Sequence, residues 1–338
     1  MKNPNMPAGH IKLSNIIAPD ADENRVAFLE KLGIRYAYTW KGGDLVRAYD
    51  ELARLRELLS RHGITLYNAG DYKIAKSPNI HLGTPERDRD IEAFAEVLRT
   101  LARLGVYNTT FTWEPDQVWS SGQTMTRGGA IARYCDEREL EKKELTHGRR
   151  YEKEELWENF NYFMRRIIPV CEETGVRLAL HPNDPPMPEI AGIACLIISR
   201  DDYRRAFTIA DSYASASYKA SGARPSLGME FCCGCWLEGG ERFGDILAGV
   251  REFAAEKRII ITHFRNVDQP LPHFVETFID GGYMDMYRLM RTFYEADYDG
   301  TIIYDHSPIL LPDGGGWAET AYSVGYMQAL MRVASERL

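Results

Sequence analysis

Hydrophobic positions along the chain switch between a helical and a strand-like spacing. Amphipathic runs end at a glycine and are followed directly by short runs of β-branched and aromatic residues. This junction recurs at four places: KLGIRYAY (31–38), RHGITLYN (61–68), RLGVYNTT (103–110) and ETGVRLAL (173–180). Glycine closes a last helical turn in the left-handed conformation, and the residues after it favour a strand. The pattern therefore predicts helices that alternate with strands in right-handed units, which build a parallel sheet.

The whole chain divides into eight such units. The predicted strands are 11–17, 34–40, 64–70, 106–113, 176–182, 226–232, 259–267 and 301–306. The predicted helices are 22–32, 44–61, 85–104, 151–174, 200–213, 241–257, 284–296 and 317–334. An open doubly wound sheet would carry a glycine fingerprint after its first strand, whereas the sequence there is APDADE. We therefore predict an α/β protein with the (β/α)8 architecture of a TIM barrel.

Residues 114–150 are too long for an ordinary strand-to-helix loop. The segment begins with aromatic and small residues and ends in a charged run. It could be a solvated insertion, but it follows the carboxyl end of the fourth strand, where barrel active sites form. We expect a lid-like insertion within one catalytic domain that spans residues 1–338.

The charge balance and the cysteine content narrow the class of protein. The chain has 41 Lys and Arg against 49 Asp and Glu, a net charge of -8, which argues against nucleic acid or an anionic membrane as partner. It has six cysteines, too few for a secreted disulfide scaffold. The first 17 residues lack the apolar core of a signal peptide, and the sequence has no apolar run long enough to span a membrane. These features predict a cytoplasmic enzyme.

Four residues with metal-binding side chains fall at the ends of the last four predicted strands: His181, Cys232, His263 and Asp305. Each has an ordinary structural alternative: a hydrogen-bonded core histidine, an inert buried cysteine or a loop-capping aspartate. Strand alternation, however, directs all four toward the barrel interior at its carboxyl-terminal rim. Two imidazoles, a thiolate and a carboxylate suit a first-row transition ion. We predict a metal site.

The motifs around these residues resemble those of the mannonate dehydratase family, metal-dependent barrels of the xylose-isomerase-like kind. The matching stretches are HPNDPP (181–186), GMEFCCGC (228–235), HFRNV (263–267), YDH (304–306), GGAIARYCDE (128–137) and GGYMDM (281–286). The resemblance covers residues 105–330. It implies that His181, Cys232, His263 and Asp305 hold manganese, with Fe²⁺, Co²⁺, Ni²⁺ or Zn²⁺ as alternatives.

Three elements depart from the family pattern. The family's F-R-W-Y-G motif is missing from the N-terminal region, and the glycine and arginine expected after His306 are Ser307 and Pro308. The F-H-E-x-x-H element retains Glu276, but Val275 and Ile279 replace its histidines. The metal ligands are thus kept while groups expected to touch substrate differ.

The resemblance implies a hydro-lyase of hexuronate catabolism that dehydrates a sugar acid, D-mannonate first, to 2-keto-3-deoxy-D-gluconate. Asp305 and His306 would share the proton transfer. Tyr322, which matches a family tyrosine, would be a general acid or base, or it would only pack its helix. Two alternatives are a sugar isomerase or epimerase on the same metal barrel and a catalytically impaired paralogue that binds sugar acids.

Four further residues are candidates for contacts with this substrate. Arg265 shares a strand face with His263, so its guanidinium could hold a sugar carboxylate bidentately or could belong to a salt bridge at the rim. Asn266 follows it directly. Asn183 and Asp184, in the proline-rich HPNDPP stretch, could bind a hydroxyl or shape a rigid turn. Barrels of this kind commonly pair, so we also expect a homodimer.

Overall fold

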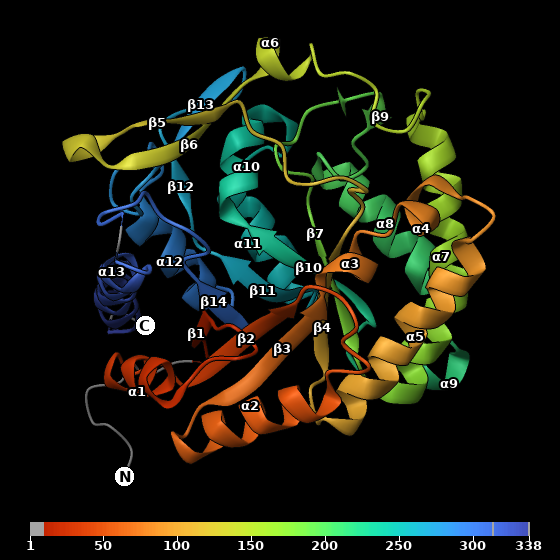
Figure 1. The fold of residues 1–338 in the computed structure, drawn as a ribbon, viewed down its shortest axis with the longest axis horizontal. Helices are drawn as coiled ribbons and strands as arrows, with labels where there is room; N and C mark the ends of the chain where they lie inside the picture. Colours follow the sequence, from red (N-terminus) through yellow and green to blue (C-terminus); the bar gives the residue numbers. More distant parts are fainter. Residues whose placement is uncertain (1–9, 313, 337–338) are drawn as a thin grey trace.

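All eight predicted strand segments form strands of one parallel sheet in this computed structural model, which describes residues 10–312 and 314–336 (Figure 1). The strands are β1 (Lys12–Ile16), β2 (Tyr36–Lys41), β3 (Thr65–Asp71), β4 (Asn108–Thr112), β7 (Arg177–His181), β10 (Leu227–Cys232), β11 (Ile259–His263) and β14 (Thr301–Ile303). Their order in the sheet is β3-β2-β1-β14-β11-β10-β7-β4. The sheet curls into a barrel, which confirms the predicted fold. The N-terminal residues 1–9, which entered the signal-peptide argument, lie outside the described residues.

The barrel has a seam between β3 and β4, the two ends of the strand order. Side chains join the strands there: the Asn68 amide donates to Thr110 Oγ1 at 3.1 Å, and the Asn108 amide donates to the Tyr67 carbonyl at 3.2 Å. Polar side chains thus complete a barrel that the backbone ladder leaves nearly closed.

The eight predicted helices surround this sheet (Figure 1). They are α1 (Glu23–Lys31), α2 (Tyr49–Arg61), α5 (Arg87–Arg103), α7 (Lys153–Thr174), α8 (Arg200–Tyr213), α11 (Ile246–Ala255), α12 (Met286–Glu295) and α13 (Trp317–Ser335). Gly175 ends α7 with a φ of 71°, the left-handed conformation that the helix–glycine–strand junction requires. Among the described residues, none of the helices has both the length and the apolar character needed to cross a membrane.

Shorter helical segments connect these units. They are α3 (Tyr72–Ala75), α4 (Pro78–Leu82), α6 (Glu137–Leu140), α9 (Ala216–Ala220), α10 (Cys233–Gly239) and the 3-10 turns η1 (Arg127–Gly129) and η2 (Gly240–Arg242). The main hydrophobic core lies where helices pack on the sheet, as the fully buried Leu178 and Leu180 of β7 illustrate. Ala179 between them belongs to a separate small cluster with Ile260 and Ile261. Because side chains alternate along a strand, Ala179 faces the barrel interior.

The long insertion after β4 contributes half of a second sheet. Its strands β5 (Gly122–Met125) and β6 (Ile131–Asp136) form a hairpin, and β6 pairs with β13 (His273–Thr277), which in turn pairs with β12 (Asn266–Val267). This antiparallel sheet stands above the carboxyl-terminal end of the barrel, at the top of Figure 1. A small ladder of β8 (Glu189–Ile190) and β9 (Ile193–Ala194) lies in the loop after β7. The insertion is therefore built into the barrel mouth by strand pairing.

Candidate metal centre and active-site cavity

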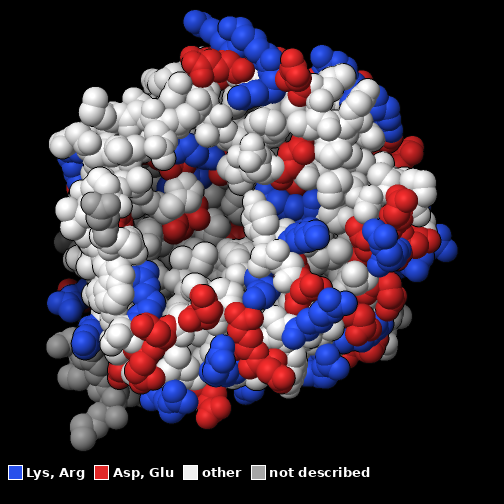
Figure 2. All heavy atoms as spheres, in the orientation of Figure 1, with Lys and Arg blue, Asp and Glu red and all other residues white. Residues whose placement is uncertain are grey.

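A cavity of about 720 Å³ opens at the carboxyl-terminal ends of the barrel strands. Figure 2 shows the hollow in this face, with acidic and basic side chains inside it. Its polar lining comes from both sheets and includes Tyr38, Lys41, Lys76, Thr110, Thr112, Glu114, Arg133, His181, Asp184, Glu230, His263, Glu276, Asp305 and His306. Such a dense set of ionisable groups in one concave pocket marks it as the candidate active site.

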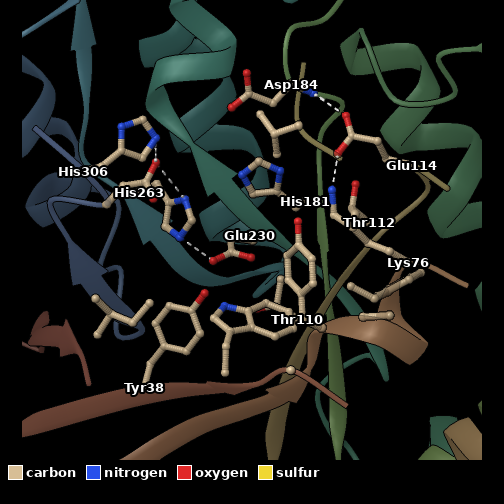
Figure 3. Close-up of a pocket in the computed structure, with 18 of the residues that line it drawn as sticks. Tyr38, Lys76, Thr110, Thr112, Glu114, His181, Asp184, Glu230, His263 and His306 are labelled. Atoms are coloured by element: carbon tan, nitrogen blue, oxygen red, sulfur yellow. Dashed lines mark hydrogen bonds and ion pairs between the residues drawn. The ribbon is translucent and has the colours of Figure 1, made fainter. Parts of the chain in front are cut away.

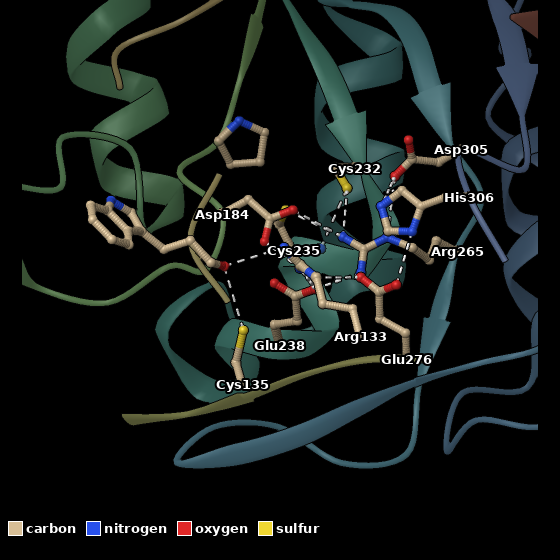
Figure 4. A network of polar contacts seen from close by, with 12 residues as sticks. Arg133, Cys135, Asp184, Cys232, Cys235, Glu238, Arg265, Glu276, Asp305 and His306 are labelled. Atoms are coloured by element: carbon tan, nitrogen blue, oxygen red, sulfur yellow. Dashed lines mark hydrogen bonds and ion pairs between the residues drawn. The ribbon is translucent and has the colours of Figure 1, made fainter. Parts of the chain in front are cut away.

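Three of the residues predicted as metal ligands, His181, His263 and Asp305, line this cavity, and the fully buried Cys232 lies next to them (Figures 3 and 4). Cys232 and His263 end the adjacent strands β10 and β11 and are register partners. One donor atom each from Cys232, His263 and Asp305 lies within 4.8 Å of the others, and His181 forms a similar group with Cys232 and Cys235. The Cys232 sulfur is the donor that the two groups share.

The electrostatics of Cys232 suit a metal ligand. Burial alone would raise the pKa of its thiol, but a hydrogen bond with Cys235, the positive charge of Arg265 and contacts with His181 and His263 hold that pKa well below its ordinary value. The backbone N–H of Cys235 also lies 3.5 Å from the Cys232 sulfur, at the start of α10. A thiolate is the form of cysteine that binds a metal.

His263 supports the same assignment because its ring nitrogens are buried without regular hydrogen bonds to any described residue. Nδ1 lies 3.4 Å from Oδ2 of Asp305, and Nε2 lies 2.5 Å from Oε1 of Glu230. Buried polar atoms are almost always satisfied, so atoms of this kind in a functional pocket call for a ligand. The donor set of imidazole, thiolate and carboxylate fits a divalent first-row transition ion.

Asp305 adopts a backbone conformation that few residues tolerate, with a φ of 67° two residues after the end of β14. Aspartate is among the few non-glycine residues that enter this left-handed region readily. The turn gathers three positively charged or proton-bearing groups around Oδ2: His263 at 3.4 Å, Arg265 Nε at 3.2 Å and His306 Nε2 at 3.2 Å. Although burial raises the pKa of Asp305, these neighbours lower it below its ordinary value, so the side chain is a carboxylate.

His306 lines the cavity with 45% of its side chain exposed. Its Nδ1 lies 2.9 Å from Oε2 of Glu276, so the ring stands between two carboxylates. Burial lowers the pKa of His306, but Asp305 and Glu276 outweigh that effect and raise it above its ordinary value. The site therefore presents a proton-bearing imidazole to whatever fills the cavity.

Arg265 does not present its guanidinium to the cavity, so it is not placed to bind a sugar carboxylate there. The side chain is 1% exposed, and its nitrogens lie 2.6 Å from Glu238, 2.9 Å from Glu276 and 3.4 Å from Asp184 (Figure 4). Arg133 of β6 reaches the same three carboxylates from above, at 2.6 Å from Asp184 and 2.7 Å from Glu276. Arg265 thus belongs to a buried ion-pair network, the alternative left open by the sequence, and Asp184 joins it at the cavity wall.

The two predicted asparagines likewise bind backbone groups. The Asn183 amide donates to the Trp113 carbonyl at 3.3 Å, and its oxygen accepts from the backbone of Ile197 at 2.8 Å. The Asn266 amide donates to two carbonyls, of Ile279 at 3.2 Å and of Met284 at 3.0 Å. Both amides fix the loops of the barrel mouth, so the geometry offers no support for their expected contact with substrate.

Tyr322 on α13 is not among the described residues that line the cavity. Its hydroxyl accepts a hydrogen bond from Arg127 at 3.0 Å, and its ring packs edge-on against Phe278. Tyr38 of β2, by contrast, lines the cavity and points into it (Figure 3). Burial, with the negative charges of Glu230 and Asp305, raises the pKa of Tyr38 well above its ordinary value. This phenol therefore keeps its proton.

Several of these cavity groups escaped the sequence interpretation. Tyr38 carried a signal, since the alternation in RYAYTWK (35–41) places Tyr36, Tyr38 and Trp40 on one strand face. Cys235, which lies near Cys232 and His181 but not in the cavity lining, also had a sequence signal, because it follows Cys232 at the C-x-x-C spacing. Lys76 and Glu114, which pair at 2.7 Å across two loops, had no local signal.

The sequence of the chain is similar to that of a known protein family. The model of the family described as D-mannonate dehydratase (UxuA) matches residues 29–147 and 134–337. A mannonate dehydratase of Lactococcus lactis subsp. cremoris (strain MG1363) is 27% identical over 327 residues, covering 83% of this chain and 85% of that protein.

Solved structures share the fold. The mannonate dehydratase of Streptococcus suis serotype 2 superposes with a TM-score of 0.83 at 21% identity, over 98% of this chain and 95% of that one. A xylose isomerase-like TIM barrel protein of Mycobacterium smegmatis, solved in complex with magnesium, gives 0.56 at 12% identity over 98% of both chains. Together with the family match over most of the sequence, these findings confirm the resemblance seen in the motifs. The chain belongs to the D-mannonate dehydratase (UxuA) family.

Proposed function

We propose that this protein is a hydro-lyase that dehydrates D-mannonate to 2-keto-3-deoxy-D-gluconate, using a divalent metal held by His181, Cys232, His263 and Asp305. The observation that carries the proposal is the convergence of Cys232, His263 and Asp305 on one point at the cavity floor. Family membership supplies the reaction, because the curated relatives that match are mannonate dehydratases.

Dehydration removes a proton from the carbon beside the carboxylate and expels a hydroxide from the next carbon. A divalent cation supplies charge stabilisation for the carboxylate and polarises the leaving hydroxyl. His306 faces the cavity with a raised pKa and so holds a proton that it can give to the departing hydroxyl. Glu276 orients its imidazole from the opposite nitrogen. Asp305, a carboxylate 3.2 Å from the other nitrogen, accepts the proton that leaves the carbon and passes it to His306, so that the hydroxide departs as water.

An anionic substrate must enter a cavity in a protein of net charge -8. Lys41, Lys76 and Arg133 line the cavity, although each is paired with a carboxylate. The Tyr38 phenol adds a donor near Glu230. We propose that substrate hydroxyls meet Tyr38 and Asp184. A divalent ion held by the four ligand residues would supply the positive charge that the substrate carboxylate needs.

Manganese is our first choice of ion because the family resemblance implies it, with Fe²⁺, Co²⁺, Ni²⁺ and Zn²⁺ as alternatives. Thiolate and imidazole donors favour transition ions over magnesium or calcium. All six cysteines are buried thiols outside any disulfide. Free thiols of this kind support a reducing compartment, and we propose the cytoplasm. We further propose that the protein forms a homodimer, because barrels of this kind commonly pair.

The test is an assay of the purified protein with D-mannonate and Mn²⁺, with formation of the keto-deoxy acid as readout. The control is the same protein after chelation and dialysis, which should lose the activity and regain it with added Mn²⁺. A panel of hexonates and pentonates together with ketoses tests the alternatives. Ketose–aldose exchange or epimerisation without any dehydration would overturn the lyase assignment, and metal-dependent sugar-acid binding without turnover would indicate an impaired paralogue.

A further inference from the structure

Glu230 is a buried carboxylate of the cavity that the proposed reaction does not use. It lies on β10, two residues before Cys232, and its side chain is 1% exposed. Both of its oxygens lack a hydrogen bond of regular geometry to any described residue. A buried ionised carboxylate is costly unless a partner compensates it, so Glu230 calls for an explanation.

The partner that the structure provides is His263. Register pairs Cys232 with His263 on the neighbouring strand, so Glu230 sits one step deeper in the barrel on the same strand face. From there its Oε1 comes within 2.5 Å of His263 Nε2 (Figure 3). The cationic side chains of Arg265 and Arg133 pair instead with Asp184, Glu238 and Glu276. Among the described residues, His263 is the one basic side chain in ion-pair contact with Glu230.

The two nitrogens of His263 face in different directions. Nδ1 faces Asp305, and His263, Asp305 and Cys232 form one donor group. Nε2 faces Glu230, which belongs to none of the donor groups found among the described residues. Glu230 therefore lies on the Nε2 side of the His263 ring, whereas Asp305 lies on its Nδ1 side.

We propose that Glu230 is a positioning residue that accepts the Nε2–H of His263 and so presents Nδ1 to the metal. This role rests on the proposed metal centre. A histidine that binds a metal through one nitrogen usually gives the N–H of the other to a carboxylate or carbonyl, which fixes the tautomer and the ring orientation. Glu230 supplies that carboxylate from the strand next to His263, whereas His181 has a backbone carbonyl, of Pro182, at 2.7 Å from its Nδ1.

Two substitutions separate the charge of Glu230 from its geometry. Glu230→Gln keeps an oxygen that can accept the Nε2–H but removes the charge, and Glu230→Ala removes both. We expect titration calorimetry with Mn²⁺ to show affinity about 10-fold weaker for the glutamine variant and about 100-fold weaker for the alanine variant. Glu252→Gln is the matched control, because Glu252 pairs with Arg200 and Arg204 on the outer helices. Its affinity should equal that of the unchanged protein.

Cobalt supplies a readout that is independent of activity. At saturating Co²⁺, Glu230→Gln should retain the thiolate-to-cobalt charge-transfer band and the d–d bands of the unchanged protein, because the ligands themselves are intact. Altered d–d bands at saturation would make Glu230 a ligand and overturn the positioning role. Unchanged Mn²⁺ affinity in both variants, with circular dichroism showing folded protein, would overturn it as well. If the unchanged protein bound neither ion, the metal centre of the proposed function would fail, and the role of Glu230 with it.

Discussion

Glu276 holds His306 by the nitrogen farther from Asp305: Oε2 of Glu276 lies 2.9 Å from Nδ1, while Nε2 lies 3.2 Å from Asp305. Glu276 is itself held at 2.9 Å by Arg265 and at 2.7 Å by Arg133. Burial alone would raise the pKa of Glu276, but His306 and the two arginines lower it to about 2. A permanent negative charge thus stands behind the proposed acid.

Replacing that acid should slow the chemical step and leave the metal bound. For His306→Asn we expect kcat with D-mannonate to fall about 10²- to 10⁴-fold, the usual contribution of a general acid. Metal content, measured by elemental analysis, should stay at the level of the unchanged protein. His273→Asn is the control, because His273 packs against Tyr134 on the second sheet and should have normal kcat. Equal activity of the two variants would remove His306 from the mechanism.

The adjacent cysteines 232 and 233 offer a matched test of the metal centre. Cys232 belongs to both donor groups, whereas Cys233 packs in the main hydrophobic core and burial raises its pKa well above the ordinary value. Cys232→Ala should abolish stoichiometric metal in elemental analysis, and added Mn²⁺ should no longer raise its melting temperature. Cys233→Ala should bind metal normally. Equal metal in both variants would contradict the ligand set.

Removing Arg265 should unfold the site rather than weaken substrate binding selectively. Its loss leaves Glu238 and Glu276 buried with less compensation, and breaking a buried pair in this way costs about 3–5 kcal/mol. We expect Arg265→Ala to lower the free energy of unfolding by that amount in urea denaturation. Arg127→Ala is the control, because its ion pair with Asp280 is half-exposed and worth about 1 kcal/mol or less. A stable Arg265→Ala protein with only a raised KM would restore the substrate-binding interpretation.

Two glycine-to-alanine substitutions in helices should act in opposite directions. A Cβ at Gly234 of α10 would overlap the Arg265 guanidinium, so Gly234→Ala should lower the melting temperature and disturb the ion-pair network. Gly325 of α13 is exposed and has open space around a Cβ. Gly325→Ala should therefore raise the free energy of unfolding by about 0.5–1 kcal/mol through helix propensity. Scanning calorimetry of both variants tests the pair, and destabilisation by Gly325→Ala would contradict it.

His62 should make the stability of the N-terminal helices depend on pH. Glu30 and Glu23 of α1, at 2.7 Å and 2.6 Å from its ring nitrogens, raise the pKa of His62 above its ordinary value. Because the folded pKa exceeds the unfolded pKa of about 6.5, this stabilisation is complete below that pH and is lost as pH rises through the folded pKa. His62→Gln should therefore lower the urea midpoint at about pH 5.5 but little at about pH 9. An equal effect at both pH values would contradict the linkage.

The fold was predictable because local signals and global topology agree. Each helix–glycine–strand junction, such as the one at Gly175, marks a turn that only glycine adopts freely, and the strand that follows is buried. The barrel rule then placed His181, Cys232, His263 and Asp305 at one rim. Their convergence follows from strand order and alternation, which a sequence displays.

The partners of the buried charges could not be predicted in the same way. Arg265 has an inward position in the sequence, yet its carboxylate partners come from three distant segments, at Asp184, Glu238 and Glu276. Arg133 arrives from an insertion whose strand pairing had no local pattern. The long-range packing of loops therefore decides which charged side chains pair with one another and which stay available to bind substrate.

That second sheet also sets the order in which the site can be completed during synthesis. Arg133 and Glu276, which bring β6 and β13 together over the cavity, are 143 residues apart in the chain. A nascent chain therefore presents the β5–β6 hairpin with an unpaired edge until the residues of β13 emerge. Long-range pairings of this kind are slow, and an exposed edge invites association with other chains. This hairpin edge therefore needs protection until β13 has been made, because the enclosure over the cavity cannot form before that strand is present.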